Sequence, residues 1–134
     1  MIVINASPGR DYDKRRWDKF PAFVLYLPLL DELVFIGTKD QREYVGNVIG
    51  IVNGQNRCGR TSINDLAKLL KSADILITVN TMPMHLASAL NVPCVAIVDA
   101  PSAEVVAHPN VRQVIMPCTV EEVMKAIEGV LNER

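Results

Sequence analysis

The sequence lacks an excess of charge of either sign and any long apolar run. It has 14 Lys and Arg against 15 Asp and Glu, a formal net charge of −1. This balance provides no general attraction to nucleic acid or to an anionic membrane, so no nucleic-acid partner is expected. The longest apolar stretch, residues 20–30, is interrupted by Pro21 and Pro28. It is shorter than the roughly 20 residues that cross a bilayer, and no membrane span is predicted.

Signatures of metal, thiol and dinucleotide chemistry are also missing. Cys58, Cys94 and Cys118 lie far apart without a CxxC pair, which indicates ordinary thiols in a reducing compartment. His85 and His108 lie 23 positions apart and form no cluster of metal-ligand residues, so no metal site is predicted. The GxGxxG and Walker phosphate loops are absent, which argues against a nicotinamide or flavin dinucleotide, and no cofactor is expected.

The N-terminal residues lack the basic start and apolar stretch of a signal peptide, so a cytoplasmic location is expected. The sequence does contain enough apolar residues for a core. Of its 134 residues, 49% are hydrophobic and 22% are charged, which is typical of a globular protein. We therefore expect one domain over residues 1–134, stable without disulfides or metal.

Apolar, strand-like runs alternate with helix-like segments along the whole chain. Strands are expected at residues 1–6, 32–37, 47–52, 74–79, 93–98 and 112–116. Helices are expected at residues 17–26, 41–45 and 83–90, after Ser62 and after Thr119. This alternation predicts a single Rossmann-like α/β domain, in which helices cover both faces of a parallel sheet.

Two of these helices have well-marked N-termini. Ser62 with Asp65, and Thr119 with Glu122, have the spacing of a capping box. The first helix is expected to turn one apolar stripe toward the core, made of Ile63, Leu66, Leu69 and Leu70. The second is expected to bury Val120, Val123, Ile127 and Val130.

Two strand-to-helix junctions carry candidate binding residues, because ligands of parallel sheets bind beyond the carboxyl ends of the strands. Residues 5–9 are small and are followed by Lys14, Arg15 and Arg16; the alternative is a surface loop with solvated charges. Residues 80–85 follow the most apolar strand, and the backbone N–H groups of the helix start there can bind phosphate. His85 lies about one turn into that helix; the alternative is an ordinary hydrogen-bonded histidine.

Residues 59–101 resemble the most characteristic segment of the family 9 glycosyltransferases, which include the ADP-heptose:lipopolysaccharide heptosyltransferases. In that family, a Gly-Lys/Arg-Thr-Ser turn precedes a helix and a strand, then Asp-Ser/Thr-Gly-Pro-x-His, and then an Ala-x-x-x-Pro-Val strand. The matching residues are Gly59, Arg60, Thr61, Ser62, Leu69, Asp74, Thr81, Pro83, His85, Ala87, Ala89, Pro93 and Val95. Residues 37–43 resemble the family's Gly-x-x-x-Glu-Arg-Glu loop, and Trp17 after the basic residues also fits.

The resemblance implies one half of a GT-B arrangement, namely the C-terminal domain that holds a nucleoside-diphosphate sugar, of ADP or UDP type. Lys14 or Arg15 would then pair with the diphosphate. Residues of the motif after the fourth strand would cradle it, namely Asn80, Thr81, Met82 and His85. Gln41 would face the ribose, with the adjacent Asp40 as its substitute, and Thr61 would face the base. Enzymes of this arrangement generally need no metal, and the resemblance assigns no catalytic residue to this chain.

The chain departs from the family pattern in ways that leave three functions open. Asn80 replaces the motif's Asp, Met82 its Gly, and Gln41 the ribose-binding Glu, while the length is about half that of a typical member. The first hypothesis is a nucleotide or nucleotide-sugar binding domain that is not competent for transfer alone. The second is an active glycosyltransferase assembled with a partner chain or a second copy. The third is a degenerate domain kept for protein contact through the apolar residues 20–30. The alternative for this run is that it is buried as a whole in the core.

Overall fold

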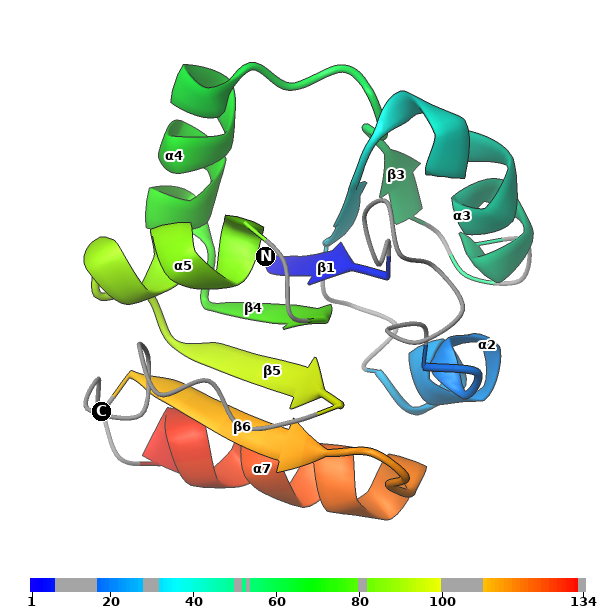
Figure 1. Cartoon of the computed structure of the whole chain (residues 1–134), viewed down its shortest axis with the longest axis vertical. Coiled ribbons are helices and arrows are strands. Elements are labelled where there is room, and N and C mark those ends of the chain that lie inside the picture. The colour runs from blue at the N-terminus through cyan, green and yellow to red at the C-terminus, as the bar shows by residue number, and fades with distance from the viewer. Residues whose placement is uncertain are drawn as a thin grey trace.

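The computed structural model describes residues 1–6, 17–27, 32–49, 52, 54–79, 82–99 and 110–132 (Figure 1). Within these ranges, six strands form one sheet in the order β3-β2-β1-β4-β5-β6, and all neighbouring pairs are parallel. This is the order of a doubly wound dinucleotide-binding fold. The predicted α/β domain with a parallel sheet is confirmed.

The elements follow one another as strand and helix along the chain. The strands are β1 (Ile2–Asn5), β2 (Leu33–Ile36), β3 (Gly54–Asn56), β4 (Ile75–Val79), β5 (Cys94–Val98) and β6 (Val111–Ile115). The α-helices are α2 (Phe20–Phe23), α3 (Arg42–Ile49), α4 (Ile63–Ser72), α5 (Met82–Ala89) and α7 (Val120–Asn132). Two short 3-10 helices, η1 (Val24–Tyr26) and η2 (Lys39–Gln41), adjoin α2 and α3. None of the described helices is long and apolar enough to cross a membrane.

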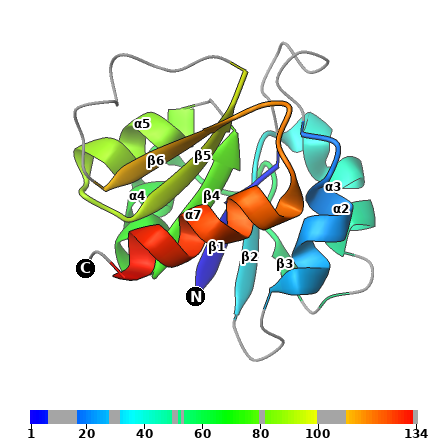
Figure 2. The same ribbon diagram turned by 90° about the horizontal axis from the view of Figure 1, so that it is seen from below.

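The core forms two layers, because successive side chains of each buried strand point to opposite faces of the sheet. On one face, Ile4 and Ile77 pack in a cluster with residues of α2, α3 and α7. On the other face, Val3 and Leu76 pack in a cluster with residues of α4 and α5. Figure 2 shows α7 crossing the sheet on the side opposite to α4 and α5. The central strands are thus covered on both faces, as their apolar sequences predict.

The predicted third strand at residues 47–52 is wrong. Helix α3 continues to Ile49, and the strand is the polar segment Gly54–Asn56. Val45 and Val48 lie three residues apart and are both buried, so this segment has the spacing of a helix although its residues favour a strand. Gly54 allows the edge strand to approach β2, since a Cβ there would lie 2.8 Å from the Phe35 ring.

The apolar residues 20–30 are divided between core and surface as far as Leu27, and residues 28–31 lie outside the described ranges. The predicted helix 17–26 is only Phe20–Phe23 followed by the 3-10 turn η1. Within residues 20–27, four side chains are buried, namely Phe20, Phe23, Val24 and Leu27. Leu25 and Tyr26 are exposed. The run is therefore partly exposed, and the interpretation that it is buried as a whole is wrong.

Both predicted capping boxes are present, with two corrections to the apolar stripes behind them. The Ser62 hydroxyl accepts from the Asp65 N–H at 3.1 Å, and the Thr119 hydroxyl accepts from the Glu122 N–H at 3.1 Å. Ile63 is 68% exposed, because the first residue of α4 points away from the sheet. Val120, the first residue of α7, packs against the core but is only half-buried.

Candidate functional site

The candidate site is the carboxyl edge of the sheet, where the strand order reverses between β1 and β4. The chain leaves β1 toward β2 and β3, and returns through α4 to place β4 on the other side of β1. In doubly wound sheets, ligands bind at such a switch point, beside the connections that follow the two strands, here β1 and β4. Lys14, Arg15, Asn80 and Thr81 belong to these two connections, and all four lie outside the described residues.

A buried polar pair lies at the end of these two strands. Asn5 and Thr78 are register partners, and the Asn5 Nδ2 donates to the Thr78 Oγ1 at 3.0 Å. The Thr78 hydroxyl in turn donates to the Val79 carbonyl at 2.8 Å. Both side chains are buried, and the pair lies where the strand order reverses. Thr78 is not among the residues predicted from the sequence; its signal is a polar residue near the end of an otherwise apolar strand.

Helix α5 begins immediately after the β4 connection, and two predicted site residues lie in its first turn. Met82 is the first residue of the helix and is 50% exposed. His85 is also exposed, and it lies three residues later on the same side of the helix. Pro83 and Met84 between them are buried against the sheet. Met82 has helical geometry, so its departure from glycine introduces a side chain at the helix start and no backbone strain.

The predicted ribose contact lies after β2, and the structure distinguishes its two candidates. Gln41 is buried, with 5% of its surface exposed, whereas Asp40 is exposed. The Gln41 Nε2 lies 3.4 Å from the Asp40 Oδ2 and donates to it. The exposed carboxylate at this strand end is therefore that of Asp40, and Gln41 supports it from below.

The connection after β3 carries Thr61 and is tied closely to the β2 connection. The Gly59 N–H donates to the Gly37 carbonyl at 2.8 Å, and Gly59 has a φ of +72°. The Arg42 Nη1 donates to the carbonyls of Asn56 at 3.2 Å and Cys58 at 3.4 Å. Thr61, half-buried, therefore follows a turn that is fixed at several points. Asp40, Gln41 and Thr61 thus follow neighbouring strands at one end of the carboxyl edge.

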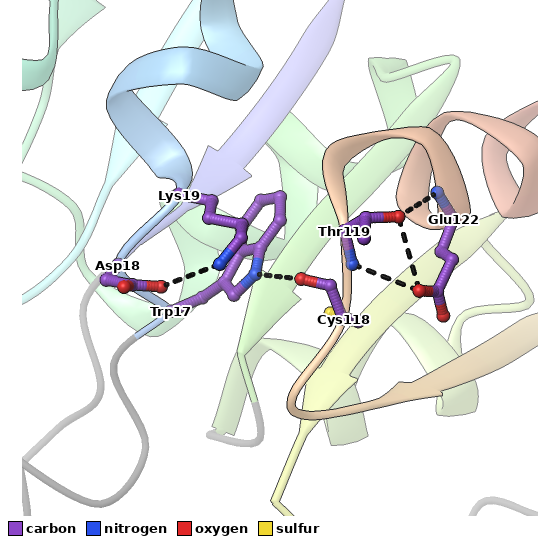
Figure 3. A network of polar contacts seen from close by, with 6 residues as sticks. All are labelled: Trp17, Asp18, Lys19, Cys118, Thr119 and Glu122. Carbon is purple, nitrogen blue, oxygen red and sulfur yellow. Dashed lines mark hydrogen bonds and ion pairs between the residues drawn. The ribbon is translucent and has the colours of Figure 1, made fainter.

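A cavity of about 280 Å³ opens at the other end of this edge, beside Trp17. Its charged lining residues are Asp18, Lys19 and Asp99, and Met116, Pro117 and Cys118 contribute most of the remaining wall. The indole N–H of Trp17 donates to the Cys118 carbonyl at 3.3 Å, and Lys19 pairs with Asp18 at 3.6 Å (Figure 3). Trp17 thereby joins the start of α2 to the turn before α7, whose capping pair is drawn beside it.

Two buried thiols lie close to this edge and remain protonated. Burial raises the pKa of Cys58 to about 11, although the nearby Arg42 opposes the change. Burial, followed by the negative charge of Glu122, also raises the pKa of Cys118. A nucleophilic thiolate is thus disfavoured at both positions.

The strand order, which reverses between β1 and β4, defines a doubly wound α/β domain. The family model of Glycosyltransferase family 9 (heptosyltransferase) matches residues 2–127. The chain therefore belongs to glycosyltransferase family 9. Among curated proteins, none gives a significant match.

Solved structures of similar fold are about twice as long as this chain. Escherichia coli ADP-heptose lipopolysaccharide heptosyltransferase II is 19% identical with a TM-score of 0.79, over 98% of this chain and 46% of its own. A family 9 glycosyltransferase from Veillonella parvula is 23% identical with a TM-score of 0.81, over 99% and 46%. The E. coli heptosyltransferase WaaC with ADP is 19% identical with a TM-score of 0.77, over 98% and 44%. The chain thus spans less than half the length of these proteins and matches part of their GT-B fold.

Proposed function

We propose that this chain binds a nucleoside-diphosphate sugar along the carboxyl edge of its sheet and does not transfer the sugar by itself. The observation that carries the proposal is the match to family 9 over residues 2–127, combined with the reversal of strand order between β1 and β4, where doubly wound folds form a crevice for ligands. The WaaC structure of the same fold contains ADP. A diphosphate suits the predicted residues, because cations and the backbone N–H groups at a helix start stabilise its negative charge.

The order of the strands suggests the direction in which the ligand lies. Lys14 and Arg15 after β1, with Asn80, Thr81 and His85 after β4, would hold the diphosphate at the crevice. Asp40 would accept hydrogen bonds from the ribose hydroxyls, since its carboxylate is exposed and Gln41 is buried. Thr61 after β3 would lie beside the base. The nucleoside therefore occupies the β2 and β3 side of the edge.

The sugar then lies on the opposite side of the crevice, toward β5 and the cavity beside Trp17. The carboxylates of Asp18 and Asp99 line this cavity and can accept hydrogen bonds from sugar hydroxyls. Its volume of about 280 Å³ suits a small ligand group. Asp99→Asn should therefore weaken binding of the sugar conjugate and leave binding of the free nucleoside diphosphate unchanged. Equal effects on both ligands would exclude the cavity as the sugar site.

The first test is a thermal-shift titration of the chain with ADP, UDP and GDP and with their sugar conjugates. We expect one nucleotide class to stabilise the protein by roughly 2–3 kcal/mol at saturation. Arg15→Ala, His85→Ala and Asp40→Asn should each reduce this effect, whereas Lys125→Ala on the surface of α7 should not. A melting temperature unchanged by every nucleotide would contradict the proposal and indicate that Met82 and Asn80 have removed the site.

A second candidate is complete glycosyl transfer with an acceptor-binding domain, which would also lie on the carboxyl edge. Three exposed apolar side chains lie there, at the starts of α4 and α5 and at the end of β6, namely Ile63, Met82 and Ile115. Contact with a second domain would bury such side chains. The test is turnover of the sugar nucleotide after addition of an acceptor domain of this family. Hydrolysis or transfer no faster than without the added domain would exclude this candidate.

A further inference from the structure

A second concave surface lies on the outside of the domain, between the edge strand β3 and helix α4. It encloses about 670 Å³ and extends along the helix, from Thr61 before its first turn to Ser72 at its last residue. We call it the β3–α4 groove. Figure 1 shows the two elements that form its walls, at the end of the sheet away from β5 and β6. Among the predicted site residues that the structure describes, Thr61 alone lines it, so its other described lining residues lie outside the proposed nucleotide site.

The groove carries more positive than negative charge. Arg57, Arg60 and Lys68 line it, and the carboxylate that accompanies them is that of Asp65. Arg60 and Lys68 are exposed, and neither forms an ion pair with any residue in the described ranges. This local excess of cations contrasts with the net charge of −1 for the whole chain.

The turn that carries the two arginines is fixed by backbone hydrogen bonds, and the Arg57 guanidinium is also held. Arg57 and Arg60 are the first and last residues of a turn, in which the Arg60 N–H donates to the Arg57 carbonyl at 3.0 Å. The Arg57 guanidinium donates twice to the Gln55 Oε1, from Nε at 3.2 Å and Nη2 at 3.0 Å. The Arg57 N–H donates to the Phe35 carbonyl in β2 at 2.8 Å, which attaches the turn to the sheet. A fixed turn lowers the entropy cost of ordering cations around an anion.

Among the described residues that line the groove, the carboxylate is that of Asp65, and it already accepts a hydrogen bond in the cap of α4. The Asp65 Oδ2 accepts from the Ser62 N–H at 3.3 Å, and the Asp65 N–H donates to the Ser62 hydroxyl. These hydrogen bonds, with a smaller contribution from Lys68, lower the pKa of Asp65 below its usual value. Asp65 therefore remains ionised as part of the helix cap, and the three cations still outnumber it.

We propose that the β3–α4 groove binds a small phosphorylated molecule through Arg57, Arg60 and Lys68, at a site separate from the nucleotide crevice. Guanidinium groups match the geometry of phosphate oxygens, and an ammonium adds a third charge-assisted contact. The groove volume is in the range of small-molecule sites. A concave surface of this size, on a chain without a net positive charge, favours a small ligand over nucleic acid or a membrane.

The test is a ¹H–¹⁵N NMR titration of the chain with inorganic pyrophosphate at low ionic strength. We expect the amide signals of residues 57–60 and 68 to shift in a saturable manner. Arg60→Gln and Lys68→Gln should each weaken this binding by roughly tenfold, equivalent to about 1.4 kcal/mol. Lys71→Gln is the matched control, because Lys71 is exposed on the same helix and does not line the groove. Two separate groove variants keep the test valid if one of them fails to fold.

The same titration distinguishes this proposal from the proposed nucleotide function. Shifts confined to residues 82–85, abolished by Arg15→Ala or His85→Ala and unaffected by Arg60→Gln and Lys68→Gln, would place pyrophosphate in the crevice and overturn the groove site. Groove shifts without nucleotide binding would support the groove site and contradict only the nucleotide function. Binding to phosphatidylserine-containing vesicles that is lost in both groove variants, without pyrophosphate binding, would replace the small ligand by a lipid surface.

Discussion

At the scale of single residues, two features shape the carboxyl edge: a glycine where a side chain would clash, and an exposed residue next to a buried one. Gly59 has a φ of +72°, and a Cβ at this position would lie 2.7 Å from the Lys39 Cα. The two connections that carry Asp40 and Thr61 can approach each other only because this residue is glycine. Asp40 is exposed at the surface, and the adjacent Gln41 occupies the buried position.

Gly59→Ala should lower the free energy of unfolding by about 1–3 kcal/mol, since it adds backbone strain and a steric clash. Gly46→Ala is the control. A Cβ at position 46 in α3 would meet only Asn56 Nδ2, at 3.8 Å, and alanine favours a helix. We expect that variant to be more stable by about 0.5–1 kcal/mol. Urea denaturation measures both; equal stability of the two variants would contradict the role given to the positive φ.

At the scale of the element, local signals placed the long helices and failed for the short, polar strand. Helices α4 and α7 begin where a hydroxyl residue is followed after three positions by a carboxylate, and the hydrogen bonds expected from that spacing are present. Residues 47–49 are rich in strand-favouring types but form the end of α3. The segment Gly54–Asn56 has no strand-favouring residue, and its pairing with β2 makes it a strand.

Thr119→Ala should destabilise the protein by about 1 kcal/mol, because the Glu122 N–H at the start of α7 would lose its acceptor. Thr38→Ala provides the comparison, since Thr38 precedes the 3-10 helix η2 without a side-chain capping bond. We expect the second change to remain within about 0.5 kcal/mol of the wild type. Thermal unfolding followed by circular dichroism measures both. A loss at Thr38 as large as that at Thr119 would mean that the cap is not the cause.

At the scale of the whole molecule, the two layers of core enclose the three cysteines in different places. Cys58 and Cys118 belong to the cluster under α2, α3 and α7, and Cys94 belongs to the cluster under α4 and α5. All three are free and buried. Reagents can therefore reach both Cys58 and Cys94 only when both layers open, whereas Cys118 also lines the cavity beside Trp17.

We expect Cys58 and Cys94 to react with a disulfide reagent at one common, slow rate that equals the rate of global unfolding. Mass spectrometry of the labelled protein measures this rate for each cysteine. Rapid labelling of only one of these two thiols would indicate local opening instead.

The free energy of unfolding should decrease as the pH rises from about 9 toward 11. The reason is that the unfolded Cys58 thiol, of ordinary pKa 9.0, ionises while the folded thiol, of pKa about 11, does not. Cys58→Ala should make this decrease shallower, which urea denaturation at several pH values measures.

The class of fold and the starts of helices α4 and α7 could be predicted from the sequence. Each of these depends on residues close together in the chain, through periodic burial and capping. The position of β3, the exposure of Asp40 rather than Gln41, the buried pair Asn5 and Thr78, and the β3–α4 groove became visible only in the fold. These depend on how apolar faces pack between distant segments, and that packing also set the reversal of strand order between β1 and β4.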